Sequence, residues 1–113
     1  MSTLPRNFKL LEEIENDSKY NGISYGLKKA DDIDLREFTG MVIDEKGNIS
    51  TFEIYCSDEY PRKPPIVKLI NTNNRRVYDQ FENSILKKTC DVISRWKETS
   101  CMADILVHIQ KRA

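Results

Sequence analysis

The sequence predicts an α+β fold in which helices pack on one antiparallel sheet. Two patterns indicate this fold. Apolar residues recur with a helical period near each end of the chain, and several short stretches between them alternate apolar and polar residues. The chain has 113 residues, a length typical of one hydrophobic core, so we expect a single domain over residues 1–113.

The first predicted element is a helix from Pro5 to Asn16. Proline suits the first turn of a helix, because its missing N–H would have no partner there. Phe8, Leu11 and Ile14 recur every three residues on or near one face, with Leu10 at the flank of that face. The pattern predicts that this face packs on the rest of the fold.

Four stretches with strand patterns follow the helix. In the first, Ile23, Tyr25 and Leu27 alternate with polar or small residues, which is typical of a half-buried strand. A short polar connector with a glycine, Asp44–Asn48, favours a hairpin between the second and third strands. The predicted strands form a meander and span residues 23–27, 38–43, 48–56 and 65–70.

The last predicted element is a helix that runs toward the C-terminus. Residues 71–98 are weakly patterned and predict no regular element. After them, Thr99 or Ser100 is suited to cap a helix, because a hydroxyl oxygen can accept an otherwise unpaired backbone N–H. The apolar residues that follow keep the spacing of one helix face: Met102, Ile105, Leu106 and Ile109.

The charge composition narrows the classes of partner. Lysine and arginine together number 18, as do aspartate and glutamate, so no net charge draws the chain toward nucleic acid or an anionic membrane. No apolar run is long enough to span a bilayer. We therefore expect neither a nucleic-acid nor a membrane partner.

The cysteines indicate a compartment and argue against a metal site. There are 3 cysteines, an odd number without a Cys-x-x-Cys pair, and the first residues lack the apolar segment of a secretory signal. Free thiols of this kind fit the cytoplasm and nucleus. Scattered cysteines and a single histidine lack the close pairing of zinc ligands, so we expect no metal and no cofactor.

The most specific motif is the string YPRKPPIVKL over residues 60–69. Its three prolines fix φ, remove three backbone donors and predict a stiff turn that leads into a strand. The string resembles the YPxxPPxVxF signature of the ubiquitin-conjugating enzyme fold. In that fold, too, a helix and a four-stranded meander lead into the motif.

The same comparison raises the question of a nucleophile. Active enzymes of that fold carry ubiquitin as a thioester on a cysteine, after a His-Pro-Asn tripeptide that helps to stabilise the oxyanion, and a tryptophan follows eight residues later. This sequence has no His-Pro-Asn, and the corresponding region is residues 71–76. Trp96 follows Cys90 by six positions. Cys90 is therefore expected to be a small, half-buried residue near the core.

Further strings are similar to one branch of that fold, the ubiquitin-conjugating enzyme variants. Residues 5–13 (PRNFKLLEE) resemble the branch's PRNFRLLEEL, residues 23–27 (ISYGL) its VSWGL, and residues 38–43 (FTGMVI) its WTGMII. The span from the motif to Trp96 has the same length as in the branch, which implies that Leu86 stands where active enzymes carry cysteine. The resemblance also implies that the last two helices of the full fold are lacking.

This resemblance implies a function without catalysis. A variant of this branch partners an active ubiquitin-conjugating enzyme, binds acceptor ubiquitin and orients its lysine sixty-three toward the partner's thioester. The chains formed are signalling chains, and the branch suggests DNA-damage tolerance. The implied partner-enzyme residues are Leu4, Pro5, Arg6 and Phe8. The implied acceptor-ubiquitin residues are Ser24, Thr39 and Ile49.

Two other functions stay open at this stage. The first is an active conjugating enzyme with a divergent nucleophile at Cys90 or Cys101, since nearby Lys87 and Lys88 could lower a thiol pKa. The second is a sorting adaptor in which this fold binds ubiquitin or a proline-containing peptide. Some of the residues above also have purely structural alternatives, because Phe8 could pack on the sheet and Ile49 could belong to the core.

Overall fold

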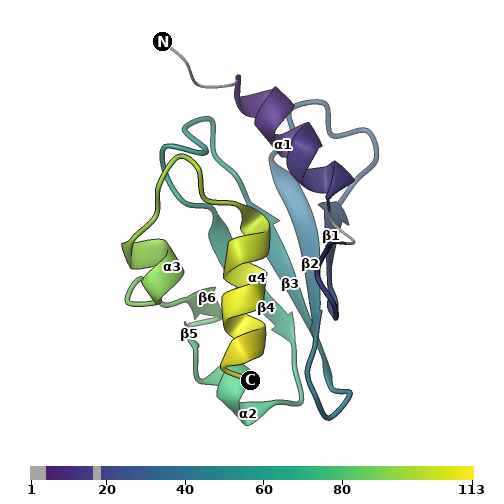
Figure 1. Cartoon of the computed structure of the whole chain (residues 1–113), viewed down its shortest axis with the longest axis vertical. Helices are drawn as coiled ribbons and strands as arrows, with labels where there is room; N and C mark the ends of the chain where they lie inside the picture. Colours follow the sequence, from purple (N-terminus) through teal and green to yellow (C-terminus); the bar gives the residue numbers. More distant parts are fainter. Residues whose placement is uncertain (1–4, 17–18) are drawn as a thin grey trace.

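The computed structural model describes residues 5–16 and 19–113 and has the predicted α+β architecture (Figure 1). The helices are α1 (Arg6–Glu15), α2 (Arg75–Tyr78), α3 (Asp91–Ser94) and α4 (Met102–Lys111). The strands are β1 (Ile23–Leu27), β2 (Glu37–Ile43), β3 (Ile49–Tyr55), β4 (Ile66–Asn71), β5 (Phe81–Glu82) and β6 (Ile85–Leu86).

The strands form one antiparallel sheet in the order β1-β2-β3-β4-β6-β5. The predicted four-stranded meander is confirmed, and the bounds of its first strand are those predicted. The weakly patterned region adds a small hairpin, β5–β6, which joins β4 at the pair Lys68 and Ile85. Two-residue strands are too short to show an alternating pattern, so the sequence did not reveal them.

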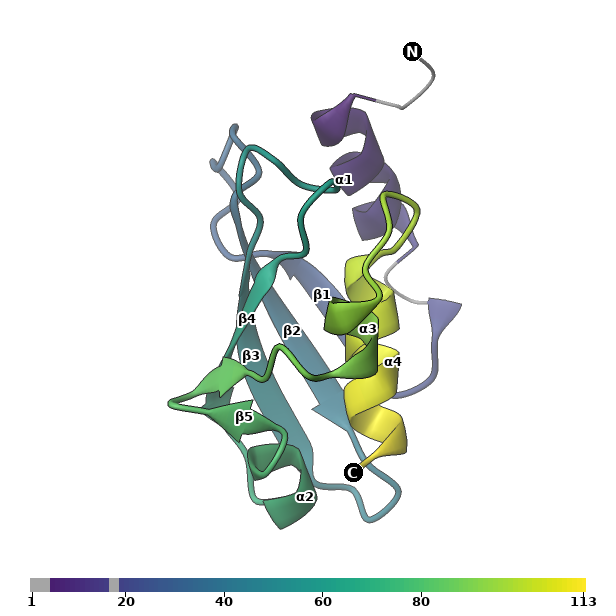
Figure 2. The ribbon, with the colours of Figure 1, turned by 90° about the vertical axis from the view of Figure 1, so that its left-hand side faces the viewer.

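Helices cover one face of the meander. Figure 2 shows α1, α3 and α4 on the same side of strands β2, β3 and β4. The buried residues of β2 and β3 alternate along each strand and meet α4 on this side. Gly40 permits the close approach, because a Cβ there would lie 3.3 Å from both terminal methyl carbons of Leu106. Tyr25 is buried in this core, as its alternating strand pattern predicts, and Phe38 is buried on the neighbouring strand.

The buried face of α1 differs from the prediction. Leu10 and Glu13 are buried, whereas Phe8 is 63% exposed and Leu11 45% exposed. Three residues cover less than one turn of 3.6 residues, so side chains spaced by three drift around the helix. Leu10 lies at the centre of the packed stripe instead of its flank, and this leaves the Phe8 side chain free of the core.

The start of α4 also differs. Neither Thr99 nor Ser100 caps it; the N-cap residue is Cys101, whose N–H donates to the Asp104 carboxylate over 2.9 Å. The Ser100 hydroxyl instead accepts the N–H of Lys97 over 3.1 Å and closes the preceding turn. A carboxylate three residues into the helix therefore takes the role predicted for a hydroxyl.

Candidate functional site

The first candidate surface is the outer side of α1. Phe8 and Leu11 are one helical turn apart and both expose their side chains to solvent. Pro5, directly before the helix, is also exposed. Leu4, the remaining apolar residue of the predicted partner-enzyme set, lies outside the described residues. The outer side of α1 thus presents an apolar strip that no other described element covers.

Arg6 has a different role from the exposed residues beside it. Its guanidinium uses all five of its N–H donors, over distances of 2.8 to 2.9 Å. One donor bonds to the Asn7 side chain, and four bond to backbone carbonyl oxygens. The four carbonyl groups belong to Asp34, Leu35, Cys56 and Ser57. We call this arrangement the Arg6 clamp; it ties the first turn of α1 to two loops.

One of the clamped loops presents a further apolar side chain. Ile33, in the loop between β1 and β2, is 85% exposed. The loop is ordered around Asp32, whose carboxylate accepts the N–H groups of Arg36 and Glu37 over 2.9 and 3.0 Å. These hydrogen bonds, that of Glu37 first, lower the pKa of Asp32. The Arg6 clamp holds the carbonyls of the two residues that follow Ile33, so the loop that carries this exposed side chain is fixed to the first turn of α1.

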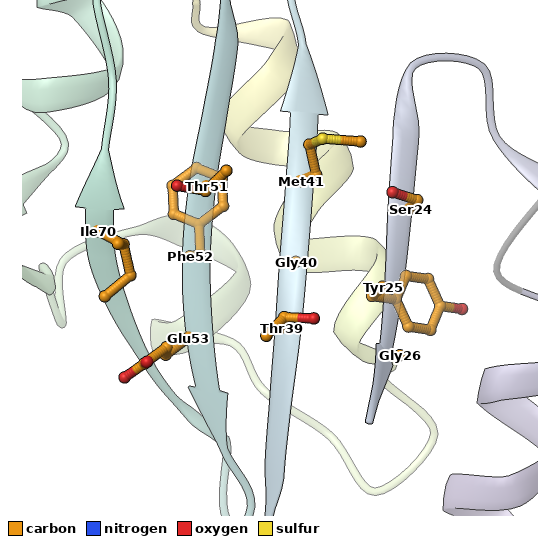
Figure 3. A pocket seen from close by; sticks show the side chains of 10 residues that line it. All are labelled: Ser24, Tyr25, Gly26, Thr39, Gly40, Met41, Thr51, Phe52, Glu53 and Ile70. Atoms are coloured by element: carbon orange, nitrogen blue, oxygen red, sulfur yellow. The ribbon is translucent and has the colours of Figure 1, made fainter. Parts of the chain in front are cut away.

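The second candidate surface is the uncovered face of the meander. It contains an open cradle with a volume of about 470 Å³. Figure 3 shows the lining residues on β1 to β4: Ser24, Tyr25, Gly26, Thr39, Gly40, Met41, Thr51, Phe52, Glu53 and Ile70. Of the predicted acceptor residues, Ser24 and Thr39 line the cradle together. Ile49 does not line it and is not core either, since it is 49% exposed at the start of β3.

The cradle is open at Gly26 on the edge strand β1 and contains an ion pair at Glu53 on β3. A Cβ on Gly26 would have no atom within 4 Å, so the space above it is open. The Glu53 carboxylate lies 3.0 Å from the Lys28 ammonium, and this hydrogen-bonded pair raises the pKa of Lys28. Met41 and Ile70 supply the apolar part of the lining. Such a shallow, mixed surface suits another folded protein better than a small molecule.

A buried carboxylate anchors α1 to the other side of the fold. Glu13 accepts the Tyr60 hydroxyl over 2.6 Å and the N–H of Met102 over 2.8 Å, and Lys9 lies 3.5 Å away. Burial raises the pKa of Glu13 above its ordinary value of 4.5, although the hydrogen bonds and Lys9 offset part of that rise. No sequence pattern predicts the burial of Glu13, because a glutamate in a helix is usually exposed.

Glu13 predicts a pH dependence of stability. Since its folded-state pKa is raised, its contribution to the free energy of unfolding is fully present below pH 4.5 and is lost as the pH rises through the raised pKa. The free energy of unfolding of the wild type minus that of Glu13→Gln should therefore decrease as the pH rises above 4.5. Urea denaturation of both proteins at a series of pH values from 4.5 upward measures this difference in the free energy of unfolding. Glu12→Gln, an equivalent change at an exposed neighbour, is the control; a difference that stays flat for Glu13→Gln would refute the prediction.

Two of the three thiols, those of Cys56 and Cys101, are poorly placed for nucleophilic chemistry. Burial raises the pKa of Cys56 to about 12. The pKa of Cys101 is also raised, by burial first and then by the charge of Glu13. The thiolate is the reactive form, so both groups are weak nucleophiles at neutral pH. Cys90 is half-buried, packs against the core as expected and stands at the N-cap of α3.

Comparisons with known proteins fit these observations. A family model described as "RWD domain" matches residues 2–113. "Ubiquitin-conjugating enzyme E2 variant 1C" of Arabidopsis thaliana is 34% identical over 116 residues, which cover 96% of this chain and 80% of that protein. "Ubiquitin-conjugating enzyme variant MMS2" of Saccharomyces cerevisiae is 30% identical over 119 residues, which cover 98% of this chain and 86% of that protein. The chain belongs to the ubiquitin-conjugating enzyme variant family.

Solved structures agree on the fold of this variant. A ubiquitin-conjugating enzyme domain from Toxoplasma gondii matches with a TM-score of 0.73 and 18% identity, over 93% of this chain and 72% of that one. Human ubiquitin-conjugating enzyme E2 G1 matches with a TM-score of 0.72 and 19% identity, over 98% of this chain and 97% of that one. At such identities the likeness concerns the fold alone.

Residues in the region that the resemblance matched to an active centre make contacts within this fold. Leu86, the position matched to the cysteine of active enzymes, is buried in β6. Asn74 caps α2 by accepting the N–H groups of Arg76 and Val77, and it donates to the Asp44 carboxylate over 2.6 Å. Its side-chain groups are therefore occupied within the fold.

Two further findings concern the described residues only. No three histidine, cysteine, aspartate or glutamate side chains among them gather as a possible metal site. None of the described helices combines the length and apolar character that a bilayer crossing requires.

The sequence reasoning missed part of both surfaces. The helical pattern predicts Leu11 on the packed face of α1, whereas its side chain is 45% exposed, and no pattern singled out Ile33. Glu53, Met41 and Ile70 were not singled out for the cradle. A signal for Met41 and Glu53 existed, because they lie on the same side of their strands as Thr39 and Thr51.

Proposed function

We propose that this variant is the non-catalytic subunit of a ubiquitin-conjugating heterodimer. The observation that carries the proposal is the exposure of Phe8, which stands in the PRNF context of the family and makes no contribution to the core. An exposed aromatic side chain on a rigid helix is the usual form of an interface anchor. The active conjugating enzyme binds the apolar surface formed by Pro5, Phe8, Leu11 and Ile33, and Leu4 precedes it in the chain.

The Arg6 clamp supports this role from within the fold. A flexible helix would lose conformational entropy when it binds, which would weaken the complex. The clamp joins the first turn of α1 to loops that are distant in sequence, the farthest at Ser57, 51 residues after Arg6. Arg6 thus acts as a positioning residue for Phe8, whereas the resemblance had assigned it to the partner contact itself.

Acceptor ubiquitin binds at the cradle with its lysine sixty-three directed toward the partner's thioester. Ser24 and Thr39 offer hydroxyl groups on adjoining strands, and Met41 and Ile70 offer apolar contact. Ile49 stands beyond the cradle, opposite Ile43 on β2, and extends the contact surface there. Holding the acceptor next to a thioester can supply on the order of 7 kcal/mol of the barrier when the reacting groups are well oriented.

The variant orients the acceptor ubiquitin, and the partner enzyme carries the reactive thioester. The raised thiol pKa values of Cys56 and Cys101 and the leucine at position 86 support the absence of a thioester on this chain. The chains formed would be signalling chains that serve DNA-damage tolerance, and the cytoplasm and nucleus are the matching compartments.

A reconstituted charging assay tests the proposal. The variant is mixed with activating enzyme, ATP and ubiquitin, alone and with an active conjugating enzyme, and the products are separated with and without reductant. We expect no adduct on the variant alone and lysine-sixty-three chains only when both proteins are present. A reductant-sensitive adduct on the variant that is lost in Cys90→Ala would show that it is an enzyme.

Gly26→Trp is expected to suppress chain formation without unfolding the protein. The space above Gly26 is open, and Gly26 is not among the residues with positive φ, so an indole can enter the cradle at little cost to the fold. We expect initial chain-formation rates to fall about tenfold or more, because acceptor ubiquitin is no longer held and oriented next to the thioester. The affinity for the partner enzyme should be unchanged. Ala30→Trp, on the exposed β1–β2 loop, is the matched control. Unchanged chain-formation rates in Gly26→Trp would show that acceptor ubiquitin does not bind in the cradle.

A further inference from the structure

A second hollow lies on the side of the fold away from β1. It is a groove of about 320 Å³ between the proline turn, the β4–β6 junction and α3, in the region that faces the viewer in Figure 2. Its main lining side chains are Tyr55, Pro64, Ile66, Ile85, Leu86 and Ile93. Of the outer-surface residues in the proposed function, none lines it.

Several of the apolar side chains that line the groove are exposed to solvent and do not belong to the core. Tyr55, Ile66 and Ile85 are all exposed, and Ile66 is exposed by 52%. Tyr55 and Ile66 are direct cross-strand neighbours on β3 and β4. Three large apolar side chains gathered in one hollow form a patch, unlike the single exposed residues that occur on any surface.

The edge of β4 beside the groove is incompletely paired. The register between β4 and β6 contains a single pair, Lys68 and Ile85, so the start of β4 has no neighbouring strand on that side in the described part of the chain. Pro64 and Pro65 come directly before β4 and have no N–H to donate. An open strand edge next to an apolar hollow is a geometry that accepts an extended segment.

The charged side chains that line the groove have one sign. Lys63 and Lys88 line it, whereas no aspartate or glutamate is among the lining residues. Lys68 lies nearby on β4, opposite Ile85 on one side and Glu53 on the other. Lys63 has an exposed pair with Glu59 over 3.2 Å. Within the described residues, neither Lys68 nor Lys88 forms an ion pair. A ligand that brings carboxylates would therefore find unpaired cations at the rim.

We propose that this groove binds an extended peptide segment with aliphatic and acidic side chains. In an extended segment, side chains alternate between two directions, so one set enters the hollow beside Ile66 and Ile85 while the other reaches the rim. The lysines at the rim select carboxylates and reject cationic segments. The proposal is independent of the proposed function, because the groove is separate from both surfaces used there.

The test uses a fluorescein-labelled heptapeptide of alternating aspartate and leucine. Its binding is followed by fluorescence anisotropy, together with two peptides in which lysine replaces aspartate or serine replaces leucine, and a neutral proline-rich peptide. We expect saturable binding of the first peptide below roughly 1 mM, at least about tenfold weaker binding of the other three, and weakening by salt.

Matched variants locate the binding. Lys63→Glu combined with Lys88→Glu should weaken binding of the aspartate–leucine peptide by about tenfold or more, because two attractions become repulsions. Lys29→Glu combined with Lys46→Glu changes the net charge equally at exposed sites outside the groove and should have little effect. Amide NMR spectra report whether each variant is folded and which residues respond to the peptide.

Several results would overturn the proposal. These are the absence of saturable binding at roughly 1 mM, equal weakening by both charge-reversal pairs, and equal or tighter binding of a control peptide. Peptide-induced NMR shift changes centred on Ser24 and Thr39, instead of Ile66 and Ile85, would show that the peptide binds in the cradle and not in the groove.

Discussion

Phe8→Ala is expected to weaken binding to an active ubiquitin-conjugating enzyme by about 2 kcal/mol or more, which is roughly thirtyfold in Kd. The side chain is 63% exposed in the free protein, so its removal takes little from the core and should leave the free energy of unfolding almost unchanged. Titration calorimetry with the active enzyme measures the first quantity and thermal denaturation the second.

The matched control is Tyr78→Ala, which removes another exposed aromatic ring from α2, a helix at the other end of the fold (Figure 1). It should leave the affinity for the active enzyme unchanged. Chain formation should fall in Phe8→Ala and recover when the active enzyme is supplied at high concentration, because only the association is impaired. If Phe8→Ala binds as tightly as the wild type, the α1 surface is not the interface.

Arg6→Met is expected to lower the free energy of unfolding by about 2–4 kcal/mol, because the clamp's carbonyl groups lose a charged donor and several of them are partly buried. Arg6→Lys should restore little of this loss, since an ammonium group cannot reproduce the planar fork that reaches four carbonyls. Urea denaturation, followed by the fluorescence of Trp96, measures both variants.

Arg95→Met is the control for the clamp, because Arg95 is exposed at the end of α3 and makes no side-chain hydrogen bond within the described residues. It should change the free energy of unfolding by less than about 0.5 kcal/mol. If Arg6→Met were as stable as this control, or if Arg6→Lys were fully stable, the hydrogen bonds of the clamp would not be what fixes α1.

The meander could be predicted because apolar and polar residues alternate in its sequence as buried and exposed side chains alternate in its strands. In β2, the side chains of Phe38 and Val42 face the core and that of Thr39 faces outward, so alternation in the sequence reproduces alternation in space. The order of elements predicted from these patterns agreed with the order around the family motif. The family that the motifs indicated is the one that the relatives show.

Features that depend on contacts between distant residues could not be predicted. The burial of Glu13 requires Tyr60 and Met102, which lie 47 and 89 residues further along the chain. The packed stripe of α1 centres on Leu10 for the same reason, since tertiary contacts decide which side of a helix is covered. Ile49 was placed by string matching, which gives a position along a strand but not the outline of a hollow across four of them.

The α1 helix has a consequence for the synthesis of the protein. Its residues leave the ribosome before the other described elements, but they are held by the carbonyls of Cys56 and Ser57 and by the N–H of Met102. The helix therefore cannot reach its final position until nearly the whole chain has been translated. A nascent chain that has not yet reached Met102 therefore lacks the fixed surface around Phe8, and the proposed heterodimer would form only after that point.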